Sequence, residues 1–226
     1  MKLIPQLALL GALLASSVSQ AAVIGFNGGT ATLNSGGTVV TSNAVNRDNV
    51  KSYEEGGFRI EFLFAGTPTP FSSNIGNYYG NGNAVIHAHW DAGDFGVVTQ
   101  IKITKIDGTA FDMNYFVLTS NTLTGGGPAT GTEEAFIHAS VDGTTSSFSQ
   151  MLPPENWGFP TNQVFLGSQF DGVKAVWFNV RNGVDCFGMD NFYIDEEAPG
   201  VPEPGSLALA ALALAGAAAT RRRKPG

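Results

Sequence analysis

The chain has 226 residues, of which 43% are apolar and only 14% are charged, and its net charge is −7. This acidic balance argues against a nucleic-acid partner, because phosphate binding requires clustered Lys and Arg. The single cysteine, Cys186, excludes an internal disulfide and any site built from several thiolates. The 29 Gly and 16 Phe residues favour a Gly-punctuated all-β domain with an aromatic core.

Residues 1–21 have the pattern of a signal peptide. Lys2 supplies the positive charge, residues 3–14 form an apolar segment, and Ser19-Gln20-Ala21 places small residues where signal peptidase reads them. The alternative, a buried helix or membrane anchor, is less favoured because the apolar run is too short to span a bilayer. We therefore predict cleavage by signal peptidase after Ala21.

Residues 22–195 have the period-2 alternation of β-strands. The clearest example is residues 58–64, FRIEFLF, where four apolar side chains alternate with Arg59 and Glu61 and one leucine. Further strands are predicted at 84–90, 97–106, 114–119, 134–141, 173–180 and 191–195, with shorter candidates at 22–26, 38–41, 147–152 and 163–166. Turn sequences such as Asp107-Gly108 separate them.

About ten short strands without intervening helices predict a single antiparallel β-sandwich, most simply a jelly roll. The stretches 27–49 and 65–83 are rich in Gly, Asn, Ser and Thr and are expected to form long loops or mobile edges. Loops of a sandwich are where ligands are usually met.

Two histidines, His87 and His89, are two residues apart on a predicted strand, so both project from the same face. A transition-metal site would need His138 and Asp91 or Asp94 to complete the ligand set. Solvent-facing histidines explain the pattern equally well, because the intervening residues form the apolar face. We favour the solvent-facing reading and expect no metalloenzyme.

Calcium is the better metal hypothesis. In extracellular β-sandwiches, calcium ions are often held by carboxylate and backbone carbonyl oxygens near the terminal strands. Glu54 and Glu55 near the start of the domain and Asp190 near its end would form a structural calcium site if the first and last strands pair. The alternative is that the glutamates belong to a polar turn and Asp190 to a strand entry.

Three aromatic residues are candidates for stacking on a sugar ring. Trp157 lies in a Pro-rich loop, and Tyr78 and Tyr79 precede a Gly-Asn repeat. The favoured alternative is a hydrophobic plug over one end of the sandwich.

No catalytic pattern is recognisable. The chain has no G-x-S-x-G motif, and Asp185 beside Cys186 would raise the pKa of the thiol. The prediction is that the protein is not an enzyme, although a pair of carboxylates for glycan hydrolysis leaves no sequence signature.

Residues 196–205 form an acidic, Pro-rich linker, and residues 206–226 form a tail. Its apolar run, 207–219, would span only about 20 Å as a helix, which is marginal for a membrane. The basic residues that follow would be retained on the cytoplasmic side. The elements of this region are, in order, Pro202, Glu203 and Pro204, the apolar run, and Arg221, Arg222 and Arg223.

This order resembles the PEP-CTERM sorting signal of Gram-negative bacteria. The resemblance implies recognition by exosortase after a transient stay in the inner membrane. It also implies removal of the tail and delivery to the cell surface or extracellular matrix. A simple C-terminal anchor is the alternative, but it leaves the Pro-Glu-Pro unexplained.

The body is similar to a domain commonly found ahead of PEP-CTERM tails. The resemblance rests on the short patterns at 53–58, 104–112 and 189–194. It implies a jelly roll of unassigned function, so no catalytic residue is carried over.

Loss of both ends leaves seven basic residues against 19 acidic ones, a net charge of −12. Such a surface repels anionic polymers unless divalent cations bridge them. We expect an exported protein with a structural or adhesive role in exopolysaccharide or biofilm. The alternative functions are a carbohydrate-binding module and, third, a glycan hydrolase.

Overall fold

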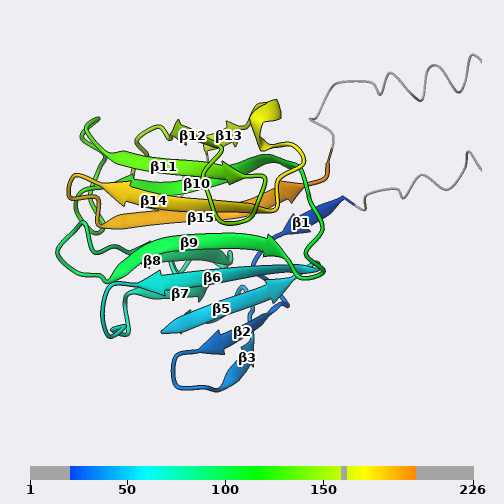
Figure 1. The fold of residues 1–226 in the computed structure, drawn as a ribbon. Coiled ribbons are helices and arrows are strands. Elements are labelled where there is room, and N and C mark those ends of the chain that lie inside the picture. The colour runs from blue at the N-terminus through cyan, green and yellow to red at the C-terminus, as the bar shows by residue number, and fades with distance from the viewer. Residues whose placement is uncertain (1–20, 159–161, 197–226) are drawn as a thin grey trace, which may run out of the picture. The chain divides into compact units, whose positions relative to one another are not determined.

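The computed structural model describes residues 21–158 and 162–196. These residues form two antiparallel sheets that lie one behind the other (Figure 1). In the described chain the only helical element is the short 3-10 turn η1 (Ser168–Phe170). The predicted all-β sandwich is confirmed.

The seven-stranded sheet contains the two strands that later position the candidate site. Its order is β13 (Asn162–Phe165), β10 (Met113–Thr122), β15 (Cys186–Ile194), β8 (Val85–His89), β7 (Ser73–Gly76) and β4 (Asn46–Asp48), with β1 (Ala22–Ile24) also paired to β15. The long strand β15 therefore has β10 on one side and β8 and β1 on the other.

The eight-stranded sheet covers the other side of the core. Its order is β12 (Phe148–Met151), β11 (Glu134–Ser140), β14 (Ala175–Arg181), β9 (Val98–Lys105), β6 (Phe58–Phe64), β5 (Val50–Glu55), β2 (Thr30–Leu33) and β3 (Thr38–Val40). Strand β6 has the predicted bounds. Its Phe58, Ile60 and Phe62 are buried while Arg59 is exposed, as alternation requires.

The core lies between the sheets and is rich in aromatic rings. Phe178 of β14 contacts three rings of the opposite sheet, with centroid separations of 5.3 Å to Phe116, 5.8 Å to Phe187 and 5.9 Å to Phe192. All four side chains are fully buried. These edge-to-face, tilted and stacked ring contacts join the two layers.

The two stretches expected as long loops contain more strand than predicted. Residues 27–49 include β2 and β4 in addition to β3, which was predicted at 38–41, and residues 65–83 include β7. Strands β4 and β7 read NRD and SNIG and lack the β-branched alternation that marks a strand in sequence. Their pairing with each other and with β8 outweighs this weak local preference.

The sorting signals predicted at the two ends of the chain fall almost wholly outside the described residues. Residues 1–20 of the predicted signal peptide, most of the linker and the tail at 206–226 lie outside the described residues, as do Pro202, Glu203, Pro204, Arg221, Arg222 and Arg223. Within the described segments, no helix is long and apolar enough to cross a bilayer.

Candidate functional site

His87 and His89 occupy the outer face of β8, and they are buried. Their relative exposures are 0% and 8%, while Ile86, Ala88 and Trp90 on the opposite face enter the core. The predicted alternation along the strand is confirmed. The expectation that these histidines face solvent is wrong, because loops cover this face of the sheet.

The cover over the histidines is aromatic. The Tyr78 ring stacks on the His87 imidazole with a centroid separation of 3.9 Å, and Tyr79 meets the same imidazole edge-on at 5.9 Å. Trp157 packs against Tyr79 at 5.1 Å. These rings come from loops and exclude water from the outer face of β8.

Cys186 completes a cluster with the two histidines. It starts β15 and lies directly opposite His89 in the antiparallel ladder, whereas His87 faces Gly188. The His87 Nε2 atom is 2.9 Å from the Cys186 sulfur. The ligand atoms of His87, His89 and Cys186 all lie within 4.8 Å of one another, and within the described segments no other three His, Cys, Asp or Glu side chains do so. We call this group the His–Cys cluster.

Asp185 and Tyr78 contact the cluster through His89. The Nδ1 atom of His89 is 3.2 Å from Asp185 Oδ2, and its Nε2 atom is 3.0 Å from the Tyr78 hydroxyl. Two buried atoms beside these contacts, His87 Nδ1 and Asp185 Oδ1, have no hydrogen-bond partner. A carboxylate on one nitrogen of an imidazole fixes its orientation and tautomer.

Burial governs the proton affinities in this cluster. It raises the pKa of Cys186 to about 12. The negative charge of Asp185 also raises this pKa, as the sequence predicted. Hydrogen bonds from the Gly126 backbone and the Trp157 side chain partly oppose this rise. Burial also lowers the pKa of His87 well below its usual value, with His89 contributing. Without a counter-ion, the cluster therefore holds a neutral thiol and a neutral His87.

Gly188 makes the cluster sterically possible. A Cβ atom at this position would lie 2.8 Å from the Tyr79 hydroxyl and 2.9 Å from His87 Cδ2. Glycine within a strand commonly marks such a close approach. The sequence did not indicate that Cys186 and Gly188 lie beside the histidines. Their proximity depends on the pairing of β15 with β8, which the sequence pattern does not show.

The other proposed partners of the histidines lie elsewhere. His138 is on β11 of the eight-stranded sheet, where its Nε2 atom is 2.8 Å from Asn179 Oδ1 and its ring stacks on Trp177 at 5.5 Å. Asp91 and Asp94 are exposed in the connection between β8 and β9. The structure does not bring these three residues to His87 and His89.

The three carboxylates expected to hold calcium have separate partners. Glu54 pairs with Arg59, and Glu55 accepts hydrogen bonds from the Phe26 backbone and the Tyr53 hydroxyl, both at 2.9 Å. Asp190 accepts from Asn83 Nδ2 at 2.7 Å, and burial raises its pKa to about 6. Glu54, Glu55 and Asp190 do not form a three-ligand group, and calcium binding stays a prediction.

The three aromatic residues singled out for glycan stacking do come together. Tyr78, Tyr79 and Trp157 form the cover of the His–Cys cluster. The Tyr79 hydroxyl is bonded to Thr119 and Ser120, so it is already used inside the protein. Trp157 is 37% exposed.

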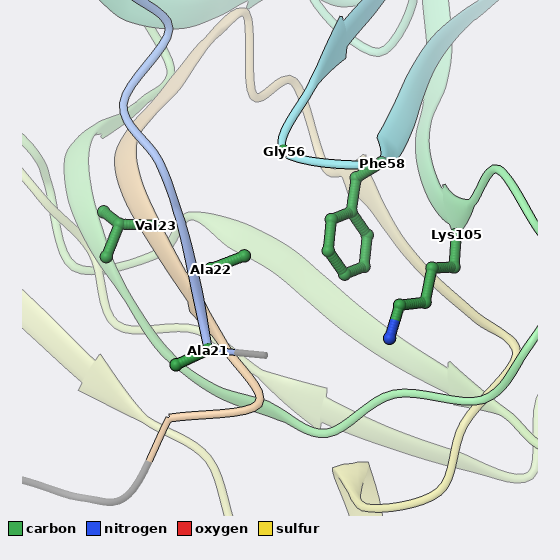
Figure 2. Close-up of a pocket in the computed structure, with 6 residues that line it drawn as sticks. All are labelled: Ala21, Ala22, Val23, Gly56, Phe58 and Lys105. Atoms are coloured by element: carbon green, nitrogen blue, oxygen red, sulfur yellow. The ribbon is translucent and has the colours of Figure 1, made fainter. Parts of the chain in front are cut away.

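A separate pocket of ≈ 410 Å³ lies beside β1. Figure 2 shows Phe58 and Lys105 directed into it beneath the Gly56 turn, with Ala21, Ala22 and Val23 along the other wall. The Lys105 ammonium is paired with Asp195 at 3.0 Å. The pocket therefore offers no unpaired charge, and its wall includes Ala21, the residue before the predicted cleavage.

Comparison with known proteins identifies one motif and several distant structures. Residues 200–224 match the family model of the PEP-CTERM protein-sorting motif. No curated protein matches the chain significantly.

Solved structures similar to the chain include the following two. The first is the K1 cleaved adhesin domain of Lys-gingipain from Porphyromonas gingivalis W83, with 12% identity, a TM-score of 0.41, and coverage of 80% of this chain and 100% of that one. The second is the family 32 carbohydrate-binding module of NanJ from C. perfringens in complex with galactose, with 13% identity, a TM-score of 0.35, and coverage of 66% and 99%.

The expected order of Pro-Glu-Pro, apolar run and Arg cluster is thus found as a recognised motif. Such a motif implies an exported protein that passes the membrane and is processed by exosortase. The chain carries a PEP-CTERM protein-sorting motif at residues 200–224, behind a β-sandwich domain.

Proposed function

We propose that this protein is a structural or adhesive component of the extracellular polymer, released to the cell surface by exosortase. The observation that carries the proposal is the PEP-CTERM motif at residues 200–224. The sandwich fits this role because an all-β domain presents the connections between its strands to the surrounding polymer. The proposed role requires no catalytic activity.

The net charge of the mature chain limits the classes of polymer that it would bind. A net charge of −12 over residues 22–203 favours neutral glycans, or anionic ones bridged by divalent cations. Retention in matrix should therefore depend on divalent ions only where the polymer is anionic.

Fractionation of the native host tests the proposal. The wild-type chain is expected in the surface and matrix fractions, whereas the triple variant Arg221→Ala/Arg222→Ala/Arg223→Ala should remain with the inner membrane. Deletion of the gene should reduce the cohesion of the matrix. Wild-type protein confined to the periplasm, or a matrix unchanged by deletion, would contradict the role.

Carbohydrate binding is a second candidate, and the exposed face of Trp157 favours it. This indole extends a cluster with Tyr78 and Tyr79, and aromatic faces are suited to stacking on sugar rings. On a glycan array, Trp157→Ala should lose binding while Trp177→Ala, on the other sheet, should keep it. Equal binding by both variants would reject this site.

A further inference from the structure

We propose that His87, His89 and Cys186 bind one late transition-metal ion, Zn²⁺ or copper, between strands β8 and β15. The site goes beyond the proposed surface role, which requires no metal. Imidazole and thiolate ligands suit Zn²⁺ and copper, whereas calcium and magnesium select oxygen ligands.

The fold places the three ligands close together before any ion is bound. They come from adjacent antiparallel strands, with Cys186 opposite His89 and His87 two residues further along β8. Their ligand atoms lie within 4.8 Å of one another. Metal bonds to nitrogen and sulfur put ligand atoms about 3.5 Å apart in a tetrahedral site, so small side-chain rotations are sufficient.

Unused hydrogen-bonding capacity gives an independent indication of a ligand. His87 is fully buried, and its Nδ1 atom has no partner. Buried polar groups in proteins are nearly always paired, and each unpaired one costs about 1–3 kcal/mol. A bound ion would take one ring nitrogen of His87 as a ligand. A small rotation of the side chain would then let the other ring nitrogen form a hydrogen bond.

The surroundings of His89 match those of a metal ligand. Asp185 Oδ2 lies 3.2 Å from Nδ1, which leaves Nε2 as the ligand atom. Ligating histidines usually donate their second N–H to a carboxylate or a carbonyl. On metal binding, Nε2 would exchange its contact with the Tyr78 hydroxyl, which is 3.0 Å away, for a bond to the ion.

Cys186 is fully buried beside the two histidines, and its sulfur lies 2.9 Å from His87 Nε2. A metal ion would bind this sulfur as a thiolate and release its proton. The aromatic cover of Tyr78, Tyr79 and Trp157 keeps solvent away. An ion held here would link β8 and β15, the two central strands of the sheet.

Metal titration of the full chain, purified without a histidine tag, tests the proposal. Cobalt serves as a probe because a Co²⁺–thiolate bond gives a charge-transfer absorption that reports on Cys186 directly. We expect one equivalent of Co²⁺ to produce this absorption, and one equivalent of Zn²⁺ or copper to abolish or replace it. The melting temperature should rise with bound metal, because the ion binds the folded state.

Variants separate this site from adventitious surface binding. Cys186→Ser and His87→Gln should each lose the absorption and weaken Zn²⁺ binding at least tenfold, while His138→Gln, a histidine on the other sheet, should behave as wild type. Because wild-type spectra report the thiolate bond without any substitution, misfolding of a variant cannot hide the answer. Absence of the absorption and of stoichiometric binding in the wild-type chain would overturn the proposal, as would unchanged binding by Cys186→Ser.

Discussion

Every second residue from Cys186 to Asp190 lies on the outer face of β15, and each of the three meets a different neighbour. Cys186 contacts His87, Gly188 leaves room for the Tyr79 hydroxyl, and Asp190 accepts a hydrogen bond from Asn83. The spacing His87-x-His89 predicted that both histidines share one face. It did not predict Cys186 beside them, because the register between strands about 100 residues apart is set by the whole sheet.

Asp190 should make stability depend on pH. Burial raises its pKa from 3.8 to about 6 in the folded state, so between these values the folded chain binds more protons than the unfolded chain. Stability from this residue is therefore present at low pH and falls as pH rises from about 4 to about 6. The loss is at most about 3 kcal/mol.

Asp190→Asn removes this titration and keeps a similar shape. Denaturant unfolding at several pH values should show the variant gaining stability relative to wild type as pH rises from 4 to 7. The difference between the two proteins isolates Asp190 from the other acids. A difference that does not change with pH would show that Asp190 titrates normally.

The connection from β8 to β9 passes tightly over the end of β8. A Cβ atom on Gly96 would lie 1.9 Å from the His89 carbonyl carbon and oxygen. Hydrogen bonds from Trp90 N to Asp185 O and from Asp91 N to Val98 O hold the same crossing, each at 3.0 Å. The space that a side chain at position 96 would need is therefore filled by backbone atoms, which cannot move aside as a flexible side chain could.

Gly96→Ala is expected to destabilise the protein by about 3 kcal/mol, because the crossing backbone must move. Gly37→Ala is the matched control, since nothing lies within 4 Å of its Cβ position and its φ is not positive. The control should change the free energy of unfolding by less than about 0.5 kcal/mol. Equal effects in chemical denaturation would refute the close crossing at Gly96.

The sequence predicted strands well where apolar and polar residues alternate, and poorly where they do not. Strand β6 has its predicted bounds, and β8, β9 and β11 differ from prediction by one residue at each affected end. Strand β15 begins five residues before its predicted start, because Gly188 and Asp190 interrupt the apolar pattern. These two residues lie on the outer face of β15, where contacts with other elements, rather than the apolar alternation, determine the residue type.

At the scale of the whole molecule, the aromatic contacts around Phe178 help to link the two layers. Phe178→Ala should destabilise the protein by about 3–5 kcal/mol, because its ring fills space between three others and leaves a cavity. Phe71→Ala, at a ring that is 64% exposed, should have little effect on the melting temperature. Similar losses in the two variants would contradict the described core.

The C-terminal sorting motif and the fold class were readable from the sequence, while the His–Cys cluster was not. A sorting tail is recognised from the order of its parts along the chain, so the linear sequence is sufficient. A sandwich core follows from alternation. A site built from residues on β8 and β15, under loops from elsewhere, depends on which strands are neighbours, and composition does not specify this order.

Intact mass spectrometry of the protein recovered from the surface of its native host tests the proposed export and processing most directly. The expected chain starts near Ala22 and ends near the Pro202–Pro204 motif, because signal peptidase and exosortase have each removed one end. Surface protein that still carries the unmodified tail with Arg221, Arg222 and Arg223 would contradict it.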